Sequence, residues 1–119
     1  MENKIEVEEY IRTKDGRIDK VDRYSIGCCV YHCKNGMCID ECETVGIPIS
    51  DIKKHSSNII DLIEEDDIIR IIDDYDDEII IHIDSKNLHD RVKRRLESET
   101  WKLKSIVTKE QFKNIEYFF

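Results

Sequence analysis

Residues 29–42 read CVYHCKNGMCIDEC, and the Asn35-Gly36 pair at the centre of this stretch predicts a β-hairpin. Asn-Gly is the strongest short-range hairpin signal, because a type I′ turn needs a positive φ at both central residues. Since side chains alternate between the two faces of a strand, a turn at this pair places four cysteines on one face. These residues are Cys29, Cys33, Cys38 and Cys42.

In this register Cys33 lies opposite Cys38, and Cys29 lies opposite Cys42. Both pairs occupy non-hydrogen-bonded positions, where opposing Cα atoms are about 4.5 Å apart. A disulfide tolerates that separation. We therefore expect each pair to lie within bonding distance, and we expect Cys28 to point to the opposite face of the hairpin.

Three roles stay open for these thiols: zinc ligands, disulfides or free thiols. His32 is a further candidate zinc ligand. A single site with four Cys ligands requires a sharp bend, because the two Cys pairs are about 13 Å apart along the strand and a Zn–S bond is about 2.3 Å long. Free thiols are the expected state, since the cytoplasm keeps thiols reduced. Apart from zinc, no cofactor is expected.

The chain has 119 residues, of which 39% are charged. This length predicts one domain, residues 1–119, with a small hydrophobic core. No apolar run approaches the roughly 18 residues that a transmembrane helix requires, and the first residues lack the apolar core of a signal peptide. We expect a soluble cytoplasmic protein without a membrane partner.

Short β-branched runs predict most of the strands. Residues 68–72 and 79–83 are rich in Ile, with acidic residues before and between them, as is typical of buried strands. Residues 5–13 alternate in part, and Asp15-Gly16 predicts a turn into a second strand. A further strand is expected at residues 101–107.

Two short helices are expected in the C-terminal half. Ser85 is a candidate N-cap for a helix that ends near Glu97. Thr108 and Gln111 fit a capping box at the start of the last helix, whose apolar stripe consists of Phe112, Ile115 and Phe119. The predicted fold is α+β: a small, strongly bent antiparallel sheet or SH3-like barrel with two short C-terminal helices.

Ten acidic residues and one base, Arg70, lie between residues 64 and 84, so this segment carries a net charge of −9. Acidic side chains on hairpin turns can imitate the phosphates of a nucleic acid and occupy a basic groove on a partner protein. The alternative is that they keep two apolar strands soluble and discourage edge pairing. The candidate partner-binding residues are Glu64, Glu65, Asp66, Asp67, Asp73, Asp74, Asp76, Asp77 and Glu78.

A second charged group lies on the polar face of the first predicted helix. Its members could contact phosphates or an acidic protein, or they could form an ordinary solvated face; they are Arg91, Lys93, Arg94 and Arg95. The four histidines lie at no spacing typical of nucleophilic or metalloprotease catalysis, and the sequence has no Gly-rich phosphate loop and no Gly-x-Ser-x-Gly motif. We therefore expect a protein that is not an enzyme.

Three further stretches are KHSSNIIDLIEE at residues 54–65, KSIVTKEQF at residues 104–112 with Glu116-Tyr117 after it, and EYIRTKDG at residues 9–16. These stretches resemble small proteins encoded in phages and prophages of Firmicutes. We expect a Gly-Asp turn after the Ile-Glu segment in such relatives, whereas Asp66-Asp67 stands there in this chain. The shared motifs are a cap, a strand and a helix start, so no functional residue is carried over.

Some small acidic phage proteins are anti-CRISPRs or other inhibitors of host defence, so the resemblance implies an inhibitor of bacterial immunity in the cytoplasm of a bacterial host cell. The expected partner is a host defence protein, in particular a Cas nuclease whose nucleic-acid-binding surface is blocked. One alternative is a small metal-binding or nucleic-acid-associated accessory module that uses the Cys hairpin and the basic helix. Another is a sponge for a signalling nucleotide, which requires an oligomeric pocket.

Overall fold

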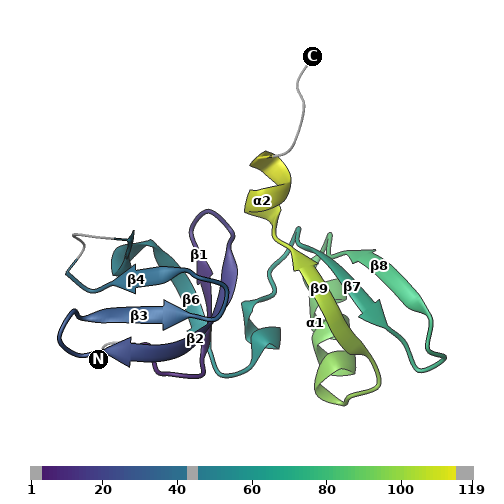
Figure 1. Ribbon diagram of the computed structural model, residues 1–119. Helices are drawn as coiled ribbons and strands as arrows, with labels where there is room; N and C mark the ends of the chain where they lie inside the picture. The colour runs from purple at the N-terminus through teal and green to yellow at the C-terminus, as the bar shows by residue number, and fades with distance from the viewer. Residues whose placement is uncertain (1–3, 43–45, 115–119) are drawn as a thin grey trace. The chain divides into compact units, whose positions relative to one another are not determined.

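Nine strands and two short α-helices form a small mixed α+β protein in the computed structural model, which describes residues 4–42 and 46–114 (Figure 1). The strands belong to two sheets, where the sequence predicts one. Contacts group the chain into two compact units, residues 1–62 and residues 63–119. The single domain expected for residues 1–119 stays a prediction.

The first unit contains a six-stranded sheet in which neighbouring strands are antiparallel, except for the parallel pair β4–β5. Its spatial order is β5 (Ile47–Pro48), β4 (Cys38–Asp40), β3 (Val30–Cys33), β2 (Ile18–Ser25), β1 (Tyr10–Thr13) and β6 (Ile52–Ser56).

The two edge strands of this sheet are consecutive in the chain, and only the 3₁₀ turn η1 (Ile49–Asp51) joins them. A flat sheet of six strands is about 24 Å wide, whereas the connection from Pro48 to Ile52 reaches at most about 14 Å. The sheet must therefore bend strongly. Neither sheet closes into a barrel within residues 4–42 and 46–114, so the SH3-like barrel is not confirmed.

The core of the first unit lies on one face of the bent sheet. Ile11, Val21, Tyr31 and Ile39 come from four adjacent strands and are almost completely buried, because their strands alternate between core-facing and outward-facing residues. Arg12 is also buried, and its Nη1 donates a hydrogen bond to the carbonyl oxygen of Leu62 at 2.8 Å, at the end of the 3₁₀ turn η2 (Ile59–Leu62).

The Cys hairpin forms, but the predicted pairing of Cys33 with Cys38 is wrong by one residue. The structure pairs His32 with Cys38, and the amide of Cys33 donates to the Met37 carbonyl at 2.8 Å. Of the two turn residues, Gly36 takes a positive φ of 95° and Asn35 does not. The connection is thus a three-residue loop, a type I turn followed by a left-handed glycine, and its extra residue shifts the register.

The second unit contains a three-stranded antiparallel sheet with β7 in the centre and β8 and β9 at the edges. The elements of this unit are β7 (Ile68–Ile72), β8 (Glu78–His82), α1 (Lys86–Glu97), β9 (Lys102–Val107) and α2 (Lys109–Asn114). Figure 1 shows α1 across one face of this sheet. The buried side chains of the unit include Ile69, Ile71, Val92 and Leu96, so the helix and the central strand supply much of its core.

Local sequence signals place both helices correctly. Ser85 Oγ accepts the amide of Leu88 at 3.2 Å, as expected of an N-cap. Thr108 Oγ1 accepts the amide of Gln111 at 3.3 Å at the start of α2. Phe112, expected in an apolar stripe, is 47% exposed, and the other two stripe residues, Ile115 and Phe119, lie outside the described residues. None of the described helices is long and apolar enough to cross a membrane.

Gly46 is a position where the fold requires glycine. Its φ is 72°, and a Cβ there would lie 2.9 Å from the carbonyl oxygen of Cys38. We expect Gly46→Ala to lower the free energy of unfolding by about 2 kcal/mol, because it adds both backbone strain and a clash. Denaturant titration followed by circular dichroism measures this change.

The control for this prediction is Gly27→Ala, since a Cβ at Gly27 meets no atom within 4 Å and its φ is not positive. That variant should differ from the wild type by no more than about 0.5 kcal/mol. Equal stability of the two variants would contradict the role given to Gly46.

Candidate functional site

Two of the nine candidate partner-binding acids are buried and hold the second unit together. Asp67 is fully buried, and its Oδ2 accepts the amide of Glu64 at 2.7 Å while its Oδ1 accepts the amide of Lys109 at 2.9 Å. Glu64 Oε1 lies 3.1 Å from Lys109 Nζ. These bonds tie the segment before β7 to the first turn of α2, so neither carboxylate is available to a partner.

Two more of these acids flank the turn of the β7–β8 hairpin and form bonds within the protein. Asp73 Oδ1 accepts the amides of Tyr75 and Asp77, each at 2.9 Å, and so closes the turn. Glu78 lies 2.5 Å from Lys104 and 3.5 Å from Arg70. The hydrogen bond from Lys104 is the main reason that the pKa of Glu78 is lowered.

The other five acids, Glu65, Asp66, Asp74, Asp76 and Asp77, are exposed. Asp66 lies 3.6 Å from His82. We call Asp74, Asp76 and Asp77 the acidic tip, since they lie together in the turn between β7 and β8. None of these three carboxylates forms an ion pair within the part of the chain that the structure describes.

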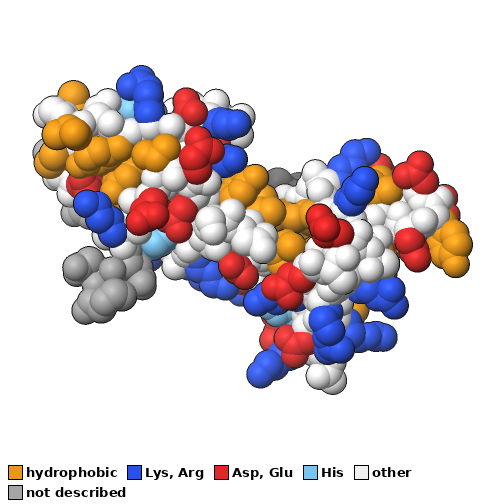
Figure 2. Space-filling view, turned by 90° about the horizontal axis from the view of Figure 1, so that it is seen from below, with side chains coloured by type: hydrophobic (Ala, Val, Ile, Leu, Met, Phe, Trp, Pro, Cys, Tyr) orange, Lys and Arg blue, Asp and Glu red, His pale blue; other side chains and the backbone are white. Residues whose placement is uncertain are grey.

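Large apolar side chains accompany the acidic tip. Tyr75, within the same turn, is 82% exposed, and Ile80, on the edge strand β8, is 63% exposed. Figure 2 shows acidic and hydrophobic side chains next to each other at the right-hand end of the view, where this hairpin lies. Exposed apolar area with polar residues around it is typical of a protein-binding surface.

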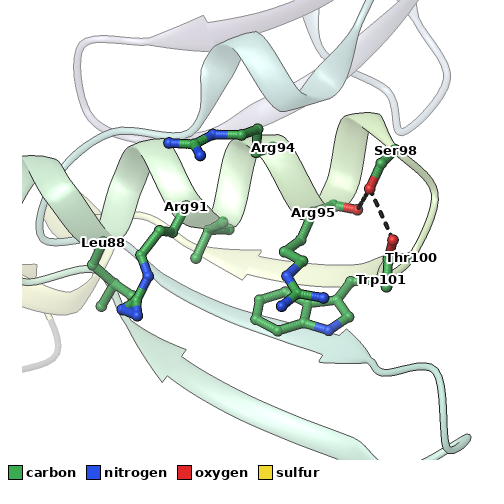
Figure 3. A pocket seen from close by; sticks show the side chains of 8 residues that line it. Leu88, Arg91, Arg94, Arg95, Ser98, Thr100 and Trp101 are labelled. Carbon is green, nitrogen blue, oxygen red and sulfur yellow. Dashed lines mark hydrogen bonds between the residues drawn. The ribbon is translucent and has the colours of Figure 1, made fainter.

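The basic residues of α1 line a groove of about 640 Å³ together with Leu88 and Trp101. Figure 3 shows that Arg91 and Arg95 extend to the same side of the helix, whereas Arg94 projects from another side. Arg95 lies over the Trp101 ring, with its Cζ 5.6 Å from the ring centroid. All three arginines line the groove, and we call Leu88, Arg91, Arg94, Arg95 and Trp101 the basic groove.

The basic groove carries uncompensated positive charge. Neither Arg91 nor Arg94 is paired with a carboxylate in residues 4–42 and 46–114. Lys93, the fourth predicted member, does not line the groove. Trp101 was expected only as part of a strand and not as a site residue; its place shortly after a basic helix was the available signal.

The predicted face of four cysteines does not exist, because the shifted register sends neighbouring thiols to different faces. Cys33 points into the core, where burial and, to a lesser extent, Asp19 raise the pKa of its thiol to about 12. Cys38 lies opposite His32 instead. All five cysteines are free thiols, and within the described residues no three His, Cys, Asp or Glu side chains are arranged to hold a metal ion.

One of the two predicted thiol neighbourhoods does form. A hydrogen bond with Cys29 is the main reason that the pKa of Cys42 is raised. Next to them, the hydroxyl of Tyr24 donates to Glu41 Oε1, and this bond raises the pKa of Tyr24. The group lies where the β2–β3 turn meets the end of β4, and its thiols are not bonded to each other.

A histidine-centred group is the arrangement that spacing along the sequence did not reveal. His32 Nδ1 lies 3.7 Å from Cys38 Sγ, and His32 Nε2 lies 3.0 Å from Ser25 Oγ. The three residues come from three adjacent strands, β2, β3 and β4.

The chain matches no protein-family model, no curated protein and no solved structure.

The buried role of Asp67 can be tested by substitution. Asp67→Ala should lower the free energy of unfolding by about 3 kcal/mol, because two amides lose a charged acceptor inside the protein. Thermal unfolding followed by circular dichroism gives this value. Glu65→Ala is the matched control, since Glu65 is exposed and its loss should change stability by no more than about 0.5 kcal/mol. A similar small effect at Asp67 would show that its carboxylate is dispensable.

Proposed function

We propose that the protein is a non-enzymatic inhibitor of bacterial immunity that binds a nucleic-acid-binding host protein, in the first place a Cas nuclease, through the β7–β8 hairpin. The observation that carries the proposal is the acidic tip: three exposed carboxylates without ion pairs in the described residues, next to the exposed Tyr75 and Ile80. The likeness of several segments to phage proteins supports the same class of function.

Electrostatics explains why such a surface suits a nucleic-acid-binding partner. A groove that binds phosphates is lined by Lys and Arg. Carboxylates on a rigid turn are negatively charged, as the phosphates are, so they can bind the same groove. Asp73 fixes the turn through two hydrogen bonds to its backbone, so little conformational entropy is lost on binding. Tyr75 and Ile80 add apolar contact area, whose contribution salt does not screen.

The experiment reverses two charges of the tip and leaves its turn intact. In Asp74→Lys/Asp77→Lys the backbone amide of residue 77 still donates to Asp73, because only side chains change. We expect this double variant to weaken binding to the nuclease and inhibition of its cleavage by about tenfold or more, since like charges then face each other. Affinity of the wild type should also fall as NaCl rises.

The matched control is Asp22→Lys/Asp90→Lys, which makes the same change in net charge at two exposed acids outside the hairpin. It should inhibit like the wild type. If both double variants lose the same amount of affinity, net charge and not the acidic tip determines binding, and the proposed surface is wrong.

A second candidate function is a nucleic-acid-associated module, and the basic groove is the observation that favours it. Binding of single strands combines positive charge along the backbone with aromatic rings on which bases stack. Arg91 and Arg94 supply the charge, and the guanidinium of Arg95 over Trp101 supplies a flat, cationic stacking surface. The metal-binding version of this module has no ligand set among the described residues.

Fluorescence separates this second candidate from the first. Trp101 is the only tryptophan, so a single-stranded oligonucleotide that enters the groove should quench the emission of the wild type. Arg91→Ala/Arg94→Ala should weaken that binding by about tenfold and reduce its salt dependence by about two phosphate contacts. Quenching that is equal in this variant and the wild type would contradict the candidate, and Lys86→Ala/Lys102→Ala controls for general loss of positive charge.

A further inference from the structure

We propose that Cys38 is a nucleophilic thiol, with His32 as its general base and Ser25 as the residue that positions the imidazole, and that it reacts with small-molecule disulfides. The site lies in the first unit, whereas the acidic tip of the β7–β8 hairpin and the basic groove belong to the second unit. Its basis is the juxtaposition of three side chains whose chemistry matches a thiol nucleophile, a base and an orienting hydroxyl.

Each ring nitrogen of His32 lies close to a polar side chain. Nδ1 is 3.7 Å from Cys38 Sγ, and Nε2 is 3.0 Å from Ser25 Oγ. Arg23 Nη1 donates to the same Ser25 oxygen at 3.4 Å. We assign the Nε2 proton to the bond with Ser25, because that tautomer leaves Nδ1 free to accept the thiol proton. Arg23 is also the cross-strand neighbour of His32, so a positive charge lies beside this chain of hydrogen bonds.

The strand register places the thiol on the face of the hairpin that points away from the core. His32 and Cys38 are cross-strand neighbours on the face opposite to Tyr31 and Ile39, which are buried in the core. Ser25, His32 and Cys38 are each half-buried, so each side chain has contacts within the protein and also stays partly exposed.

The other four cysteines lack this arrangement and serve as internal references. Cys33 is buried, and its pKa is raised to about 12. Cys29 and Cys42 neighbour each other, and this contact raises the pKa of Cys42. Cys28 is exposed, and no hydrogen bond of its side chain is present in the described residues. Since the thiolate is the attacking species, a thiol with a base at hand reacts faster than one without.

The reaction is a thiol–disulfide exchange. His32 Nδ1 takes the proton of the Cys38 thiol, and Cys38 Sγ attacks one sulfur of the reagent. The new bond joins Cys38 to that sulfur, the S–S bond of the reagent breaks, and the second sulfur leaves and takes the proton from His32. One disulfide is consumed, and one mixed disulfide and one thiol form, so no other oxidant takes part.

The experiment exposes the full chain to oxidised glutathione at one neutral pH and follows each cysteine by peptide mass spectrometry. In the wild type, Cys38 should acquire glutathione first, ahead of the more exposed Cys28. His32→Gln should slow the modification of Cys38 by about tenfold or more, because the base is lost, and should leave the rate at Cys28 unchanged. Modification of Cys28 or Cys42 before Cys38 in the wild type overturns the proposal.

Two further measurements keep a structural effect apart from a loss of the base. The reactivity of Cys33 shows whether the fold is intact, since this buried thiol reacts only if the β3–β4 hairpin opens. Ser25→Ala should also slow the reaction at Cys38, and Ser25→Thr, which keeps the hydroxyl, should restore it. A His32→Gln variant in which Cys33 stays unreactive and Cys38 reacts at the wild-type rate overturns the role of His32.

Discussion

The contact between β2 and the β3–β4 turn is the constraint on which the arrangement of the first unit depends. Asp19 accepts hydrogen bonds from the backbone amide and the side-chain amide of Asn35, and the amide of Lys34 donates to the Lys20 carbonyl at 2.9 Å. These bonds, with the left-handed Gly36, hold a three-residue loop. The loop sets the register, and the register sends Cys33 into the core and Cys38 to the side of His32.

A single buried carboxylate has a comparable role in the second unit. Asp67 satisfies two backbone amides that are distant in the chain, at Glu64 and Lys109. A charged side chain without such partners would be costly to bury, so its bonds and its burial depend on each other. The nine acids predicted to bind a partner thus divide into four that form bonds within the fold and five others, which include the acidic tip.

The second unit carries surfaces of both signs of charge. The acidic tip ends the β7–β8 hairpin, while the basic groove follows α1. The net charge of −8 for the whole chain hides this division. Salt should weaken binding at either surface, so the chemistry of the partner, a basic protein or a single-stranded nucleic acid, and not salt dependence alone distinguishes the two candidate functions.

Signals that act within a few residues were enough to predict much of the local structure. The Ile-rich strands, the helix that follows Ser85 and the N-cap at Thr108 depend on propensity and capping, which involve neighbours in the chain. The charged groups were also visible, because exposed acids and bases need no partner to be recognised in a sequence.

The roles of these groups were decided only by the tertiary structure. Each of these roles depends on contacts between different elements of the fold. Examples are the hydrogen bonds of the buried Asp67, the contact of Arg95 with Trp101 and the hydrogen bonds of His32. The hairpin register is the sharpest case: Asn-Gly favours a two-residue turn locally, but a contact with β2 accompanies a loop of three residues. A shift of one residue reverses the face of every side chain, so the sequence by itself determined where the hairpin lies, and only tertiary contacts decided which thiol meets the imidazole.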